Sequence, residues 1–386
     1  MARKRWTGAR PDPSKSRGAR LAAAQKAALT LASRQDIQLI LLTGSLARGI
    51  ESEDSDIDIA VFTDGDTDTF IRTFLVDDIP VEINTYLLDR LAKGPATPLL
   101  TLQDLREAGR FSTGQILHSC WKYLDQARSS WLKALLNPDA ASELLALASN
   151  YLSQTQLEAV DSFADRVYCL QGAAAGLAVY ALSLTAPRFQ KPKWVIHDLR
   201  ETGSVQLLRC IRSLYIGTTM NESRVELHLE SIEKQLLAGL ELGGLPPLIM
   251  TDSMSDEYFY IYRTFRDAIS LNNDGDFEGC AYTSMYALRL LNALLQGDTG
   301  TKTVAEKEVN SWRREALAVL VPVIGLKESN LEAAREQLIE CGMMLEREYR
   351  RRFLESQPFE WFEEGSWRNS RTSQCSSLSD SFVSHP

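Results

Sequence analysis

The sequence of 386 residues predicts an α+β fold, in which a small β-sheet domain with flanking helices precedes an α-helical bundle. Two apolar runs near the N-terminus have the length and composition of strands, and a pair of segments rich in β-formers follows them before residue 87. From residue 101 to about residue 355, Leu-, Ala- and Glu-rich segments recur at three-to-four spacing, which is typical of amphipathic helices. The expected organisation is a disordered basic arm (residues 1–17), a sheet domain (18–95), a helical domain (96–360) and a disordered Ser-rich tail (368–386).

The sheet domain is expected to begin with a helix and a buried strand. Residues 18–33 carry an apolar stripe that would pack a helix onto a sheet, formed by Leu21, Ala24, Ala28 and Leu31. Residues 39–42 read LILL and end in Thr43-Gly44-Ser45, which predicts a buried strand followed by a tight turn. A short segment (46–49) and an acidic loop (50–55) then lead to the second strand.

This second strand, expected over residues 56–62, brings two carboxylates to one face. Side chains alternate along a strand, so Asp56 and Asp58 point the same way, while Ile57 and its apolar neighbours point into the core. Carboxylates on one face repel each other, and Mg²⁺ resolves that repulsion because it binds carboxylate oxygens and keeps positions open for phosphates. Gly44-Ser45 opens a helical turn whose backbone N–H groups can hold phosphate oxygens. A phosphate-binding turn beside a metal pair predicts nucleotide chemistry.

These residues carry a resemblance to a known family. The segment GSLARG at residues 44–49, followed by SDID at residues 55–58, resembles the G-S-x-x-x-G…[S/T]-D-x-D signature of the DNA polymerase β-like nucleotidyltransferases. Within that superfamily it is similar to the small-molecule adenylyltransferases of the kanamycin nucleotidyltransferase type. Over about residues 20–95, the resemblance implies a small mixed β-sheet domain that uses Mg²⁺ and a nucleoside triphosphate, most often ATP. It also implies that Gly44, Ser45 and Arg48 hold the phosphates and that Asp56 and Asp58 hold the metal.

A hairpin is expected next. Residues 69–76 and 79–86 are rich in β-formers and flank Asp77-Asp78, a plausible two-residue turn, although a helix over residues 67–76 is an alternative. In the second arm, Glu82 and Asn84 lie on the face opposite the apolar residues, and the resemblance implies that Glu82 is a third acid, which binds metal or accepts a proton. Many relatives have Asp there, and a solvated strand residue is the alternative. Pro80 indicates an edge strand or a strand end.

The helical part offers fewer functional signals. A helix over residues 87–93 ends at Gly94-Pro95, the expected edge of the sheet domain. In related transferases a cation from the helical domain faces the triphosphate, and Lys193 or Lys191 would do so here; a solvated loop with Trp194 packed on the bundle is the alternative. The histidines at positions 118 and 197 are interpreted as surface or core residues. Residues 222–233 are expected to form an acidic amphipathic helix, solvated or lining a pocket for a cationic substrate.

The amino-acid composition limits which binding partners are expected. The net charge is −9, but residues 1–20 carry +6, so the rest of the chain carries −15. An acidic body argues against a broad nucleic-acid-binding face and suits a cationic small substrate. The basic arm could still contact nucleic acid or a partner. No apolar run approaches the ~20 residues that span a bilayer, and no apolar segment of a secretory signal follows the charged N-terminus.

We therefore expect a cytoplasmic protein without membrane contact, whose six scattered cysteines are reduced thiols. The predicted activity is metal-dependent transfer of a nucleoside monophosphate to a hydroxyl of a small molecule, such as an antibiotic or a biosynthetic intermediate. One alternative is nucleotidyl transfer to a protein or an RNA end. A second is a nucleotide-binding protein without catalysis. Whether the chain forms a homodimer stays open.

Overall fold

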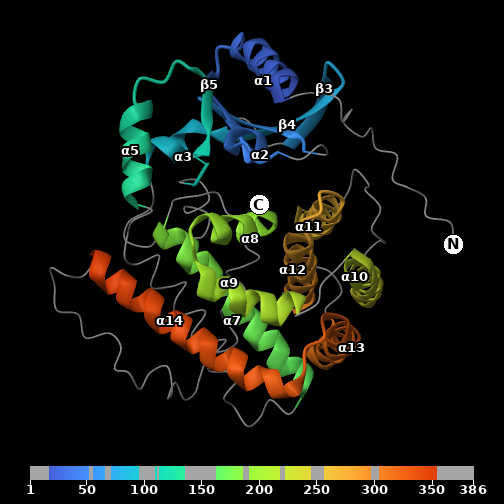
Figure 1. Cartoon of the computed structure of the whole chain (residues 1–386). Coiled ribbons are helices and arrows are strands. Elements are labelled where there is room, and N and C mark those ends of the chain that lie inside the picture. Colours follow the sequence, from blue (N-terminus) through green and yellow to red (C-terminus); the bar gives the residue numbers. More distant parts are fainter. Residues whose placement is uncertain are drawn as a thin grey trace. The chain divides into compact units, whose positions relative to one another are not determined.

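The computed structural model describes residues 17–51, 55–65, 71–94, 109–110, 113–134, 162–185, 191–217, 222–244, 256–296 and 304–353 (Figure 1). The chain packs as two compact units, Met1–Asn137 with Pro187–Phe189, and Pro138–Ala186 with Gln190–Pro386. The first unit holds a five-stranded sheet, and the described part of the second is helical. The predicted α+β fold is therefore confirmed.

The first unit is built on a mixed sheet with the strand order β3-β4-β2-β1-β5. Its elements are α1 (Arg17–Ala32), β1 (Ile37–Thr43), α2 (Gly44–Arg48), β2 (Ile57–Thr63), β3 (Ile71–Val76), β4 (Ile79–Leu87), α3 (Leu88–Ala92), β5 (Gln115–Ser119) and α5 (Leu124–Ala134). Strands β2 and β4 are parallel, and the remaining neighbours are antiparallel. Arg17, the last residue of the expected basic arm, is the first residue of α1, and the rest of the arm lies outside the described residues.

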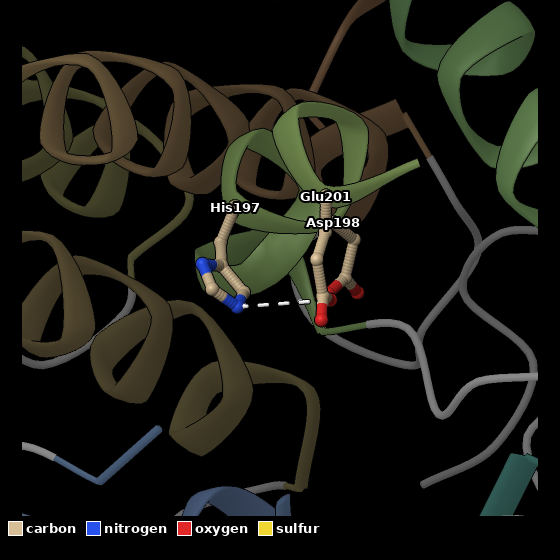
Figure 2. Close-up of side chains that lie close together, drawn as sticks. All are labelled: His197, Asp198 and Glu201. Atoms are coloured by element: carbon tan, nitrogen blue, oxygen red, sulfur yellow. Dashed lines mark ion pairs between the residues drawn. The ribbon is translucent and has the colours of Figure 1, made fainter. Parts of the chain in front are cut away.

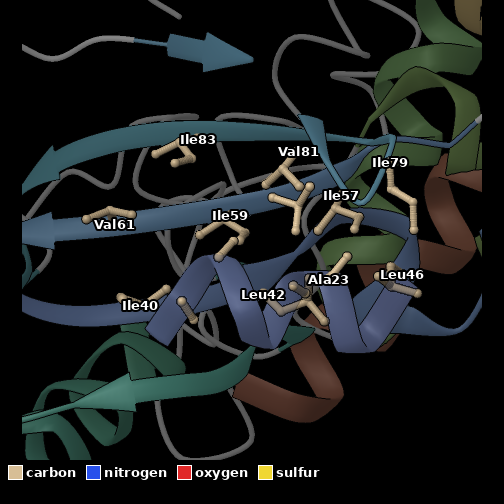
Figure 3. Packing of buried hydrophobic residues seen from close by; sticks show 14 of the residues in the cluster. Ala23, Ile40, Leu42, Leu46, Ile57, Ile59, Val61, Ile79, Val81 and Ile83 are labelled. Carbon is tan, nitrogen blue, oxygen red and sulfur yellow. The ribbon is translucent and has the colours of Figure 1, made fainter. Parts of the chain in front are cut away.

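Helices cover both faces of this sheet. On one face the alanines of α1 pack against alternate residues of β1, β2 and β4, and this cluster includes Ala23, Leu42, Ile57, Ile59 and Val81 (Figure 3). On the other face, α3 and α5 supply Leu91 and Trp131 to a second cluster with the intervening strand residues. Trp131 donates its indole N–H to the carbonyl of Leu91 over 3.1 Å, so this buried ring has a polar partner.

The predicted hairpin is confirmed, and its helical alternative is wrong for the described residues 71–76. Asp77 and Asp78 both have positive φ, 52° and 60°, as the central residues of a type I′ turn require. Strand β4 is internal, so Pro80 is not on an edge; its pairing with β2 begins only at Val81. Pro80 therefore marks the end of the strand, the second of the two predicted readings.

Strand β5 corrects the expectation that the chain is helical from residue 101. It pairs antiparallel with β1, and the first compact unit therefore extends past the edge expected at residue 95. The strand has five residues and only Ile116 and Leu117 as large apolar side chains, too few to show an alternation. Its partner lies far away in the sequence, so the pairing depends on tertiary structure.

The second unit is an α-helical assembly. Its elements are α7 (Phe163–Thr185), α8 (Pro192–Glu201), α9 (Val205–Ile211), the π-helix η1 (Arg212–Ile216), α10 (Glu222–Leu242), α11 (Asp256–Asn273), α12 (Phe277–Gln296), α13 (Glu306–Ile324), the 3₁₀ helix η2 (Glu328–Asn330) and α14 (Leu331–Phe353). Helix α12 packs against α8, α10, α11 and α13, and most of its residues are buried. Helix α10 confirms the amphipathic pattern predicted for residues 222–233.

Among the residues that the structure describes, no helix is both long and apolar enough to cross a membrane. The described cysteines, at positions 120, 169, 210, 280 and 341, are free thiols. The predicted Ser-rich tail lies outside the described residues.

Candidate metal and nucleotide site

Three carboxylates predicted from the sequence come together at one end of the parallel strand pair. Asp58 on β2 and Glu82 on β4 are direct register partners, and both are buried, with 6% and 7% of their surface exposed. Asp56 lies just before β2 rather than within it, because the strand begins at Ile57. Each of the three side chains offers an oxygen, and these oxygens lie within 4.8 Å of one another. Strand pairing thus joins residues that are 24 positions apart in the sequence.

The donor set fits a divalent cation. Magnesium and manganese prefer oxygen ligands, and three carboxylates supply them without sulfur or nitrogen. Without a cation, three like charges this close would raise the free energy of the folded state. The residues present therefore fit a metal of this class.

The turn after β1 lies directly against one of these carboxylates. Gly44 has a φ of +73°, and a Cβ built on it would lie 1.8 Å from Oδ2 of Asp58. A side chain at this position is strained by the backbone conformation, and it would require the Asp58 side chain to move. The buried Ser45 follows as the second residue of α2. The predicted phosphate-binding residues and the predicted metal-binding residues are thus neighbours.

Helix α2 is held at its C-terminal end by two side chains from elsewhere in the unit. Gln115 of β5 donates its amide to the carbonyl of Ala47 over 2.8 Å. Arg17 of α1 donates to the carbonyl of Leu46 over 3.4 Å. Arg48, the last residue of α2, is half-buried, with its Nη1 atom shielded from solvent. These contacts hold the short helix that begins at Gly44.

The segment that enters β2 is also anchored. Arg20 of α1 is only 3% exposed and donates to the carbonyl of Ser55 over 3.0 Å. Thr43 donates its hydroxyl to the carbonyl of Asp58 over 3.3 Å. The sequence did not reveal Arg20 as part of the site, because a single arginine in a helix gives no signal of what it contacts.

Lys193, the predicted phosphate-binding cation of the helical part, lies within the second unit. Its Nζ atom forms an ion pair with Asp267 at 2.9 Å and lies 5.8 Å from the centre of the Trp194 ring. Trp194 is 4% exposed, so it is packed in the helical unit. The contact of Lys193 with a triphosphate stays a prediction.

A second group of three potential ligands lies on α8. His197, Asp198 and Glu201 offer atoms within 4.8 Å of one another (Figure 2). His197 and Glu201 are four residues apart, and Nε2 of His197 lies 3.9 Å from Oε2 of Glu201. Helical spacing alone accounts for this pairing, so the geometry of the group does not require a metal.

Comparison with known proteins agrees with the geometry of the first unit. Residues 25–89 match the family model described as "Polymerase beta, Nucleotidyltransferase", and this range includes the turn at Gly44 and all three carboxylates. A solved structure of a nucleotidyltransferase-like protein from Exiguobacterium sibiricum 255-15 is similar at 11% identity and a TM-score of 0.32, covering 78% of this chain and 89% of that one. At this identity and TM-score, the likeness is too distant to assign a fold or a function.

The curated protein sequences give no match to the chain. The family assignment therefore depends on the matched range and on the residues within it. The first unit of the chain carries a nucleotidyltransferase domain of the DNA polymerase β-like superfamily.

Proposed function

We propose that the protein is a metal-dependent nucleotidyltransferase that transfers a nucleoside monophosphate, AMP from ATP, to a hydroxyl group of a small molecule. The observation that carries the proposal is the in-register pairing of Asp58 with Glu82, with Asp56 close enough to share a ligand. A nucleotidyltransferase family match over the same residues supports it. A protein that only binds nucleotides has no need for three carboxylates held at such close range.

Each group in the site has a role in this proposal. Gly44, Ser45 and Arg48 would hold the β- and γ-phosphates, and Asp56 and Asp58 would hold Mg²⁺ ions. When bound, these ions would neutralise charge on the phosphate oxygens and lower the pKa of the attacking hydroxyl.

The reaction itself is an in-line substitution at phosphorus. The acceptor oxygen forms a bond to the α-phosphorus, the bond from that phosphorus to the β-phosphate oxygen breaks, and pyrophosphate leaves. Glu82 would either complete the metal site or accept the proton that the hydroxyl loses. The contact between Gly44 and the Asp58 carboxylate supports this division of roles, because it puts phosphate-binding backbone beside the metal ligands.

The choice of a small molecule as the proposed acceptor is based on the net charge of the chain. Outside its first 20 residues the chain carries −15, which disfavours a polyanionic acceptor such as RNA. The proposal places the protein in the cytoplasm and gives it ATP, Mg²⁺ and a small hydroxylated acceptor as partners.

The acceptor class is tested with ATP labelled at either the α- or the γ-phosphorus. The full chain is incubated with Mg²⁺ and, separately, with hydroxylated amino sugars, with RNA and with a protein mixture. We expect the α-label to enter a small product while the γ-label leaves as pyrophosphate. Transfer of the α-label to RNA or protein alone would overturn the small-molecule acceptor, but it would still support nucleotidyl transfer. Release of the γ-label as inorganic phosphate would overturn the reaction itself.

A further inference from the structure

The metal-binding face of β4 carries a polar residue that the proposed reaction has not used. Asn84 lies two positions after Glu82, so the two side chains share one face of the strand. Its Nδ2 atom lies 3.0 Å from Oε1 of Glu82. An ionised carboxylate can only accept hydrogen bonds, so the Asn84 amide presents its NH₂ group to it.

From this contact we infer that Asn84 is a positioning residue, which holds the Glu82 carboxylate in the orientation needed to bind the metal. The inference rests on the proposed metal site. It adds a residue to that site, and it states how the third carboxylate is held there.

Glu82 needs such support more than the two aspartates do. Its side chain has more rotatable bonds, so fixing it in one orientation costs more rotamer entropy. Its register partner on β2 is Asp58, a like charge that favours any rotamer pointing away. A hydrogen-bond donor on the same face counteracts that repulsion.

The chemistry of an amide suits this role. A lysine or arginine at position 84 would form an ion pair with Glu82 and compete with the metal for its charge. The amide is neutral, so it orients the carboxylate without removing the charge that attracts the cation.

The surroundings of Asn84 in the sheet point to the same partner. Its register partners are Ala60 on β2 and Ile71 on β3, and neither residue type has a polar side chain. The side-chain partner of the amide is therefore found along the strand, at Glu82.

The test measures binding of Mn²⁺ to the full chain by electron paramagnetic resonance, without nucleotide or acceptor. It compares the wild type, Asn84→Ala, Glu82→Asp and the double variant. Glu82→Asp keeps a carboxylate but shortens the side chain by one methylene, which withdraws it from Asn84. Leu75→Ala, at an exposed position of the neighbouring strand β3, is the matched control for disturbance of the sheet.

We expect Asn84→Ala to weaken Mn²⁺ binding about 10- to 100-fold, as is usual for residues that orient metal ligands. The same substitution should have little further effect in the Glu82→Asp background, and Leu75→Ala should bind Mn²⁺ like the wild type. If Asn84 had only a structural role, Asn84→Ala would weaken Mn²⁺ binding equally in the wild-type and Glu82→Asp backgrounds, and that result would overturn the inference. Wild-type affinity in Asn84→Ala would do so as well.

The same experiment separates this inference from the function on which it rests. If the wild type does not bind Mn²⁺, the proposed metal site is wrong and the inference falls with it. If the wild type binds and Asn84→Ala does not differ from it, only the inference is wrong. Thermal unfolding of each metal-free variant shows whether its fold is intact.

Discussion

The position of the Asp58 carboxylate depends on the absence of a side chain at Gly44. The carboxylate of Asp58 lies where the Cβ of any other residue at position 44 would be. Asp56 and Asp58 could be predicted from a motif of fixed spacing, and Glu82 from two-residue alternation together with the family resemblance. The contacts of Arg20, Gln115 and Asn84 with this site could not, because each depends on which backbone or side-chain group the fold brings within reach.

Substitution of Gly44 by alanine should therefore affect both stability and metal binding. We expect Gly44→Ala to lower the free energy of unfolding by about 1–2 kcal/mol, because a non-glycine residue is strained at positive φ. The displaced Asp58 carboxylate should weaken Mn²⁺ binding at least about tenfold. Urea unfolding and Mn²⁺ titration measure the two effects.

Gly65→Ala is the matched control for this substitution. Apart from its chain neighbours, no described residue has an atom within 4 Å of a Cβ built at Gly65, which is in the same unit. Gly65→Ala should leave stability and Mn²⁺ binding close to those of the wild type. If Gly44→Ala behaved in the same way, the proposed coupling between the turn and Asp58 would be contradicted.

Removing the charge of Asp58 should have opposite effects on stability and on metal binding. In Asp58→Asn we expect the free energy of unfolding of the metal-free protein to rise by about 1 kcal/mol, because one of three carboxylates that repel each other is neutralised. The same variant should lose Mn²⁺ binding. Asp64→Asn removes an exposed charge just after β2 and should change neither property. An Asp58→Asn variant that is less stable without metal would show that the carboxylates do not repel each other as described.

At the level of secondary structure elements, the sequence predicts best where a pattern is long and local. The amphipathic helix α1, the first two strands and the β3–β4 hairpin all correspond to observed elements. Strand β5 was missed because five residues cannot show a period and because its partner β1 is distant in the sequence. The family resemblance, not the hairpin, implied that Glu82 lies on a strand beside the one that carries Asp58, and the two residues are register partners.

The packing of α10 on α12 contains a buried histidine that the sequence pattern did not distinguish. His228 is fully buried, and its Nε2 atom lies 3.0 Å from the hydroxyl oxygen of Ser284. Its Nδ1 atom has no hydrogen-bond partner among the described residues. Burial lowers the pKa of His228 from 6.5 to about 4, because the charged imidazolium would lose its hydration.

This shift predicts how stability depends on pH. The unfolded chain takes up the His228 proton near pH 6.5, and the folded chain only near pH 4, so stability is lost as the pH falls through this window. The free energy of unfolding lost through His228 over this window is about 3 kcal/mol. Urea unfolding of the wild type and of His228→Gln at pH 7 and pH 4 measures it.

The variant should show a smaller pH dependence than the wild type over this window. His197→Gln, which changes a partly exposed histidine on α8, is the control and should retain the wild-type dependence. Equal pH dependence in the wild type and His228→Gln would contradict the assignment of this effect to the buried ring.

Along the full chain, a unit that contains a nucleotidyltransferase domain is followed by a helical unit. Composition and period predict this two-part architecture, because a change from two-residue alternation to three-to-four spacing is visible along the chain. The boundary between the units could not be predicted, since β5 returns to the sheet after the Gly94-Pro95 break in the pattern. The acceptor of the proposed transfer could not be predicted either, because acceptor choice depends on the complete site and not on a single motif.

In the proposed mechanism, Asp56, Asp58 and Glu82 form a metal centre for nucleotidyl transfer. The most direct test is pyrophosphate release from ATP, GTP, CTP and UTP with Mg²⁺ and a panel of hydroxylated and amino-sugar acceptors. We predict acceptor-dependent release by the wild type and by Asp64→Asn, and none by the Asp56→Ala/Asp58→Ala double variant. Release by the double variant at the wild-type rate would show that these carboxylates do not form the metal centre of the reaction.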